Sequence, residues 1–148
     1  MGTLKFTKMH GCGNDYVYFD CFSQNIEDPE ALSIRLSDRH KGVGGDGIIM
    51  VCPSDIADGR MRIFNADGSE AMMCGNGIRC VAKFLYDTGL AHKKHLEIDT
   101  LSGVKYCDII EKNGEAVAVT VDMGRAELVP GRIPVSLPGE RIVGETVS

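Results

Sequence analysis

Apolar and polar residues alternate, or form short apolar runs, along several stretches of 5 to 8 residues. Such stretches are typical of buried and half-buried β-strands. They are residues 4–8, 16–22, 48–52, 60–65, 96–100, 104–111 and 116–122. The last two flank Asn113-Gly114, a dipeptide that favours a tight hairpin turn. The pattern therefore predicts about seven strands.

A helical period follows residue 74. The apolar residues of one helix face are Ile78, Val81, Ala82 and Leu85. They lie at i, i+3, i+4 and i+7, which is the spacing of a 3.6-residue turn. Gly89 stands where a C′ glycine ends a helix, and Gly75-Asn76-Gly77 begins this one with unbonded backbone amides. We expect this helix to be largely buried.

A second helix is predicted from Asp28 as N-cap and Pro29 as the first helical residue, ending near His40. Together these elements predict an α+β fold. In it a curved, mostly antiparallel sheet or barrel wraps around the central apolar helix. We expect one domain over residues 1–124, followed by a proline-rich linker or extended segment over residues 125–148.

A glycine-rich segment over residues 42–47, GVGGDG, matches the spacing G-x-G-x-x-G. The dinucleotide-binding motif needs a strand before it and a helix after it, whereas this sequence predicts the reverse order. We interpret the segment either as a flexible connector or as backbone that packs close to a ligand.

The composition argues against several classes of partner. The net charge is −5, tryptophan is absent and no basic run occurs, so neither nucleic acid nor an anionic membrane is an expected partner. No apolar stretch approaches the roughly 20 residues of a membrane span, and no export signal is recognisable. We therefore interpret the six cysteines as reduced thiols of a cytoplasmic protein. No Cys-x-x-Cys pair indicates a metal site, and no cofactor is expected.

Cys74 is the candidate catalytic residue, because it comes directly before the glycines that begin the central helix. A thiolate at such a position meets free N–H groups and the positive end of the helix dipole. These surroundings lower the pKa of a cysteine and make its sulfur basic or nucleophilic near neutral pH. The alternative is an ordinary buried thiol.

Two Cys-Gly-Asn triplets occur, at residues 12–14 and 74–76. Their asparagines and Asn65 all stand at predicted junctions between an element and a turn. Asparagine offers both a donor and an acceptor without charge, which suits a ligand that carries a carboxylate and an ammonium. The alternative for each asparagine is a bond to the backbone of its own turn.

The segments HGCGNDYVYFD (10–20), GVGGDGIIMV (42–51), FNADGSEAMMCGNGIRC (64–80) and VDMG (121–124) resemble the N-terminal half of the diaminopimelate epimerases. The resemblance implies a cofactor-independent isomerase of the lysine and peptidoglycan precursor pathway. Its substrate would be 2,6-diaminopimelate, interconverted between the LL and meso forms. Some members carry glutamine where this chain has Gly47, so any substrate contact from that side chain is lost here.

By the same resemblance, Cys74 is one of two catalytic cysteines, and Asn14 and Asn65 bind the substrate. Gly75 and Asn76 hold its α-carboxylate. The family has two similar halves with one cysteine each, and its members suggest a homodimer. We therefore expect a missing C-terminal half, and a chain that does not epimerise alone. Cys80 lies within the helix and cannot reach the opposite face of the substrate. Cys12 is the only internal candidate for the second thiol, but we interpret it as a pocket wall or packing residue.

Other functions remain open at the level of sequence. The chain could bind a small amino acid without catalysis, or act like a proline racemase, which uses the same two-thiol logic. A cysteine hydrolase or thiol peroxidase is a third class, but no histidine stands in a motif that places it beside the thiol.

Overall fold

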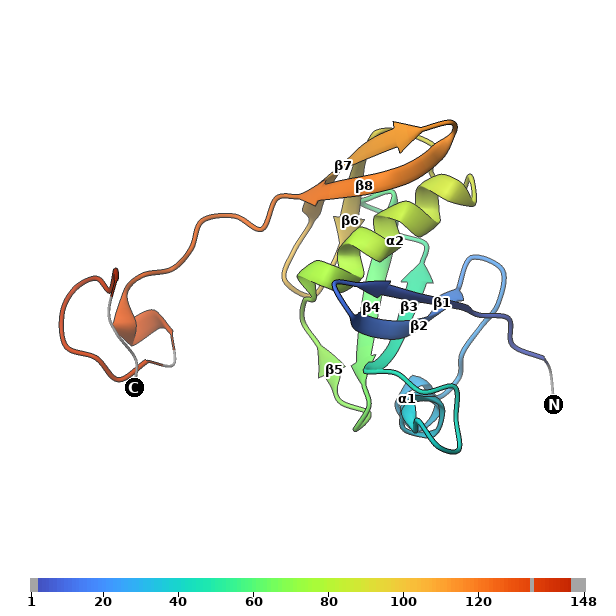
Figure 1. Cartoon of the computed structure of the whole chain (residues 1–148), viewed down its shortest axis with the longest axis horizontal. Coiled ribbons are helices and arrows are strands. Elements are labelled where there is room, and N and C mark those ends of the chain that lie inside the picture. Colours follow the sequence, from blue (N-terminus) through green and yellow to red (C-terminus); the bar gives the residue numbers. More distant parts are fainter. Residues whose placement is uncertain (1–2, 134, 145–148) are drawn as a thin grey trace.

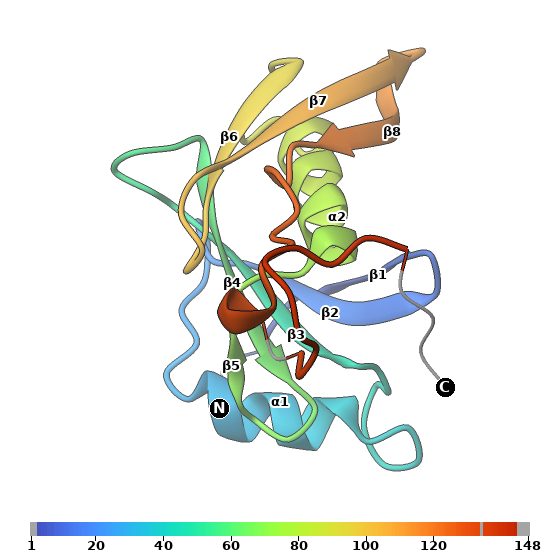
Figure 2. The ribbon, with the colours of Figure 1, turned by 90° about the vertical axis from the view of Figure 1, so that its left-hand side faces the viewer.

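The computed structural model describes residues 3–133 and 135–144. Within them, one eight-stranded sheet curls around helix α2 (Gly75–Asp87), which is the central helix in Figures 1 and 2. The strands are β1 (Thr7–Gly11), β2 (Asn14–Asp20), β3 (Gly47–Cys52), β4 (Gly59–Asn65), β5 (Glu70–Ala71), β6 (His95–Asp99), β7 (Lys105–Lys112) and β8 (Glu115–Val121).

The sheet has the order β1-β2-β3-β4-β6-β7-β8, and the short β5 pairs with β4. The β2–β3 and β4–β6 pairs are parallel, whereas the other five pairs are antiparallel. The predicted fold class, a curved and mostly antiparallel sheet around an apolar helix, is confirmed. β5 was not predicted, because a two-residue strand shows no alternation.

The apolar face of α2 forms the centre of the main core. Ile78, Val81, Ala82 and Leu85 are fully buried, as their spacing predicts. Ile49 of β3 and Ile98 of β6 belong to the same core cluster. Thr88 is the C-cap of α2, and Gly89 follows it with φ +76°, which confirms the predicted glycine stop.

Helix α1 (Pro29–Ser37) packs on the other side of β2, β3 and β4, over a smaller core of which Leu32, Phe19 and Ile48 are part. Asp28 caps it as predicted, accepting a bond from the Ala31 N–H at 3.0 Å. The helix ends at Ser37 rather than near His40. The Asp38 carboxylate accepts the backbone N–H groups of residues 40 and 41, so the chain turns there instead of continuing the helix.

Two further differences concern the ends of the domain. β1 starts at Thr7 and ends at Gly11, about three residues later than predicted, so the first turn is shorter than expected. After β8 the chain leaves the sheet, and a 3-10 turn (Pro130–Arg132) is its next element (Figure 1). Residues 134 and 145–148 of the predicted linker lie outside the described residues, and the domain division at residue 124 stays a prediction. Neither described α-helix is long and apolar enough to cross a lipid bilayer.

Candidate active site

Cys74 is the N-cap residue of α2. Its backbone is extended, and its half-buried sulfur accepts the Gly77 N–H, with 3.3 Å between Sγ and N. Serine, threonine, aspartate or asparagine usually makes this bond. The predicted position of the thiol beside the free amides of the helix is therefore confirmed.

Asn14, the first residue of β2, also contacts Cys74, although 60 residues separate them. The Cys74 thiol donates to the Asn14 side-chain oxygen, and the Sγ–Oδ1 distance is 3.2 Å. The turn between β1 and β2 lies close to the start of α2, since a Cβ on Gly11 would stand 2.9 Å from the Asn76 carbonyl oxygen. The structure thus joins the two Cys-Gly-Asn triplets into one site.

Asn76 is held by Arg79 of the same helix. The Arg79 guanidinium donates to the Asn76 side-chain oxygen at 2.5 Å and to the Gly75 carbonyl at 3.0 Å. These bonds occupy the Asn76 oxygen and leave its NH₂ group for other partners. Arg79 also contacts the sulfur of Cys12 at 3.6 Å. Cys12 is exposed in the β1–β2 turn, so it does not pack in the core, and its interpretation as a pocket wall stays a prediction.

Asn65 ends β4, and its side chain serves its own turn. Its NH₂ group donates to the Ser69 hydroxyl at 3.0 Å, and its backbone N–H donates to the Ser69 carbonyl at 2.9 Å. The buried Ser33 hydroxyl of α1 donates to the Asn65 carbonyl at 2.7 Å. Asn65 pairs with Gly47, which in turn pairs with Tyr16, so all three lie at one end of neighbouring strands.

Tyr16 is a buried titratable residue beside the site that sequence reasoning missed. Burial raises the pKa of its hydroxyl, and the nearby Cys74 raises it further. Burial likewise raises the pKa of the thiol of Cys80, a core residue of α2. These two groups are therefore protonated at neutral pH.

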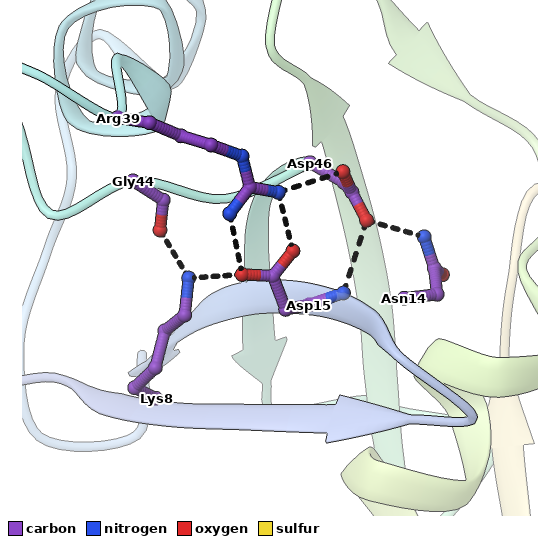
Figure 3. Close-up of polar contacts among 6 residues, drawn as sticks. All are labelled: Lys8, Asn14, Asp15, Arg39, Gly44 and Asp46. Carbon is purple, nitrogen blue, oxygen red and sulfur yellow. Dashed lines mark hydrogen bonds and ion pairs between the residues drawn. The ribbon is translucent and has the colours of Figure 1, made fainter.

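A charged cluster next to Asn14 was also missed, and Figure 3 shows it. The Asp46 carboxylate accepts the Asn14 NH₂ group at 2.8 Å. Arg39 binds Asp15 with both guanidinium nitrogens, at 2.7 and 3.1 Å, and reaches Asp46 at 3.2 Å. Lys8 pairs with Asp15 at 2.8 Å and also donates to the Gly44 carbonyl. Arg39 and then Lys8 hold the pKa of the Asp15 carboxyl well below its usual range.

Asp46 arrives at the site on the glycine-rich segment over residues 42–47. Backbone N–H groups of Gly42, Gly44 and Gly45 donate to carbonyls at the end of α1 and in the turn after it. The segment is thus packed and hydrogen-bonded, so the interpretation as a flexible connector is wrong. Asp46 was the feature of the sequence that could have pointed to this part of the site, because it is the only charged residue within the segment.

A hollow of about 430 Å³ lies beside α2, between β1 and β8. Met9, Arg79, Cys80, Lys83 and Val119 are among its lining residues. It adjoins the face of α2 that carries Arg79, rather than the Cys74 sulfur itself. Among the residues that the structure describes, no group of three or more His, Cys, Asp or Glu side chains is arranged to hold a metal ion.

Comparison with known proteins agrees with the motifs. The family model described as diaminopimelate epimerase matches residues 6–129. The diaminopimelate epimerase of Agathobacter rectalis is 56% identical over 132 residues, which are 89% of this chain and 46% of that protein. That of Methanococcus maripaludis strain C5 is 50% identical over 145 residues, or 98% of this chain and 52% of that protein. The chain spans about half the length of the curated relatives it matches.

Solved structures share the fold at much lower identity. A hydroxyproline epimerase from Agrobacterium vitis superimposes with a TM-score of 0.62 at 16% identity, covering 78% of this chain and 39% of that one. A methylitaconate-delta-isomerase gives a TM-score of 0.63 at 17% identity, covering 76% and 36%. These similarities establish the architecture only.

Proposed function

Because this chain belongs to the diaminopimelate epimerase family, we propose that it supplies the Cys74 half of a cofactor-independent epimerase site. The proposed reaction interconverts LL- and meso-2,6-diaminopimelate. The observation that carries the proposal is the position of the Cys74 sulfur between the Gly77 N–H and the Asn14 amide. It gives the sulfur a donor that stabilises the thiolate and an acceptor that stabilises the thiol.

The proposed chemistry is a proton exchange at the α-carbon. The Cys74 thiolate removes the α-proton and becomes a thiol, and the electron pair left on carbon delocalises into the α-carboxylate. A second acid then delivers a different proton to the opposite face, which inverts the centre. In the reverse reaction the roles are exchanged, and the Cys74 thiol is the acid that donates the proton.

Charge that accumulates on the carboxylate has to be stabilised, because an α-proton is only weakly acidic. The backbone N–H groups of Gly75 and Asn76 belong to the first turn of α2, which leaves such donors without helical partners. We assign them to the α-carboxylate, where a preorganised donor contributes most. We assign Asn14 and Asn65 to the polar groups of the same ligand.

The second acid–base group is not expected among the other described cysteines near the site. Cys80 is buried in the core, and Cys12 is exposed and contacts Arg79. We place this group in the part of the relatives' length that the chain does not span. We therefore propose that the 148-residue chain alone does not complete the inversion.

The test supplies that part from outside. The chain is mixed with the C-terminal half of the Agathobacter rectalis relative in D₂O, and epimerisation and α-deuterium incorporation into LL-diaminopimelate are followed by NMR. We expect turnover with both halves, and loss of about 10²–10⁴-fold in Cys74→Ala. Cys12→Ser is the matched control and should retain the rate.

Three outcomes would contradict the proposal. Robust epimerisation by the chain alone would contradict the need for a second half. Full activity of Cys74→Ala would show that the Cys74 thiol is not the acid–base group. Binding of diaminopimelate that Cys74→Ala retains, with no deuterium exchange in any mixture, would support an amino-acid-binding module instead. Proline is offered as a second substrate. Deuterium exchange into proline rather than diaminopimelate would indicate a proline racemase-like enzyme.

A further inference from the structure

The Asn14 amide has one orientation that satisfies both Asp46 and the Cys74 thiol. An ionised carboxylate only accepts hydrogen bonds, so the Asn14 nitrogen has to face Asp46, where Nδ2 and Oδ2 are 2.8 Å apart. The Asn14 oxygen is then left to accept from the Cys74 thiol at 3.2 Å. If the amide were turned over, its NH₂ group would donate to the sulfur instead. The two orientations have opposite effects on the ionisation of a thiol.

Asp46 is itself anchored on several sides. Its Oδ2 also accepts the Asp15 N–H at 3.0 Å, and its Oδ1 accepts from Arg39 at 3.2 Å. Its backbone N–H donates to the Asp15 carbonyl at 2.7 Å, and its carbonyl accepts the Ala66 N–H at 3.0 Å. Figure 3 shows the carboxylate between Arg39 and Asn14. The carboxylate that orients Asn14 is thus tied to β2 and to the turn after β4.

We propose that Asp46, anchored by Arg39, is a positioning residue that locks the Asn14 amide with its oxygen toward Cys74 and so limits the thiolate fraction of that cysteine. The inference rests on the proposed function for its purpose. A sulfur that is the base for one stereoisomer and the acid for the other needs both protonation states within reach, and the locked acceptor preserves the acid.

Three other titratable groups lie near the sulfur and are unchanged in every variant of Asp46. They are Tyr16 and Tyr18 of β2 and Cys80 of α2, and burial raises the pKa of each. All three are therefore protonated at neutral pH. A difference between the Asp46 variants therefore reports on the Asp46 carboxylate, which accepts the Asn14 NH₂ group.

The test compares two substitutions of Asp46 in the 148-residue chain. Site-resolved mass spectrometry follows iodoacetamide labelling of Cys74 from about pH 5.5 to 9, where a thiolate reacts and a thiol does not. Asp46→Ala removes the acceptor and frees Asn14 to turn its NH₂ group to the sulfur. Asp46→Asn can place an amide oxygen where Oδ2 stands, so it removes the charge while the orientation remains.

We expect Asp46→Ala to raise the labelling rate at pH 6.5 about fivefold and to move the midpoint of the profile to lower pH, because one pH unit corresponds to a tenfold change in thiolate fraction. Asp46→Asn should raise the rate less than about twofold. In an Asn14→Ala background, Asp46→Ala and Asp46→Asn should behave alike. Equal effects in the presence of Asn14, or an unchanged profile in Asp46→Ala, would overturn the proposal.

A measurement on the unsubstituted chain covers the case in which Asp46→Ala does not fold. The Asn14 side-chain amide should show one strongly deshielded proton, bonded to the carboxylate, that moves upfield when Asp46 is protonated in acid. An amide signal that ignores this titration would refute the locked orientation. Neither readout needs turnover, so a positive result here together with absent deuterium exchange would leave the positioning role standing and reject the epimerase function.

Discussion

Gly47 is the position at which the structure makes its sharpest prediction about a substitution. It begins β3, between Tyr16 of β2 and Asn65 of β4. Real Cβ atoms essentially never lie within 3.0 Å of such a neighbour. A Cβ on Gly47 would lie about 1 Å closer than that to the Phe64 carbonyl oxygen. The Tyr16 ring and the Asn65 Cα would also lie at 3.0 and 3.1 Å. Most of these atoms are backbone, which no rotamer change can move.

Relief of the contact in Gly47→Ala requires β3 and β4 to separate by about 1 Å at this end. Such a shift takes backbone bonds of about 2.9 Å beyond hydrogen-bonding distance. Two broken hydrogen bonds cost about 1 kcal/mol each, and the loss of packing costs about 1 kcal/mol more. The free energy of unfolding should therefore fall by about 3 kcal/mol. That is a large share of the roughly 10 kcal/mol expected for a domain of this size.

Urea unfolding followed by circular dichroism measures this loss. With a slope of about 2 kcal/mol per molar urea, the midpoint should fall by about 1.5 M in Gly47→Ala and at least as far in Gly47→Gln. Gly131→Ala is the matched control, because a Cβ on Gly131 meets no heavy atom within 4 Å. A midpoint in Gly47→Ala within 0.3 M of the control would refute the reasoning.

Two other substitutions test groups that hold the site. The buried Ser33 hydroxyl lies 2.9 and 2.7 Å from the carbonyl oxygens of Phe64 and Asn65, so Ser33→Ala should lower the free energy of unfolding by about 1–2 kcal/mol; an unchanged urea midpoint would contradict this. Arg39 lowers the pKa of Asp15 below its ordinary 3.8, so the stability from that carboxylate is present above about pH 4 and is lost as the pH falls further. Asp15→Asn should therefore lower the free energy of unfolding at pH 6, and by less at pH 3. The loss at pH 6 should be only about 1 kcal/mol, because Arg39 is more than half exposed to solvent. Equal losses at both pH values would exclude the ion pair as the cause.

Features that depend on near neighbours in the chain were predictable. The α2 face follows from apolar spacing, its end at Gly89 from the need for a left-handed residue, and the β7–β8 hairpin from Asn113-Gly114. The same holds for Cys74 at the helix start, because an N-cap and the amides it meets lie within three residues. In natural sequences such local preferences usually agree with the global fold, and here they do.

Boundaries set by competition between local bonds were less predictable. α1 stops at Ser37 because the Asp38 side chain takes the next backbone N–H groups, and no hydrophobic pattern records that choice. Asn65 shows the same limit, since its side chain bonds Ser69 of its own turn rather than the sulfur. An asparagine at a junction can do either, and its sequence neighbours do not decide between them.

The sequence by itself determined the elements of this protein, its family motifs and one thiol at the start of an apolar helix. Only the tertiary structure decided what faces that thiol. Asn14 reaches Cys74 because the turn between β1 and β2 packs against the start of α2, and Asp46 reaches Asn14 because β3 pairs in parallel with β2. The physical reason is that strand order and register bring together polar groups that are distant in the chain, and no periodicity along the sequence encodes which groups will meet.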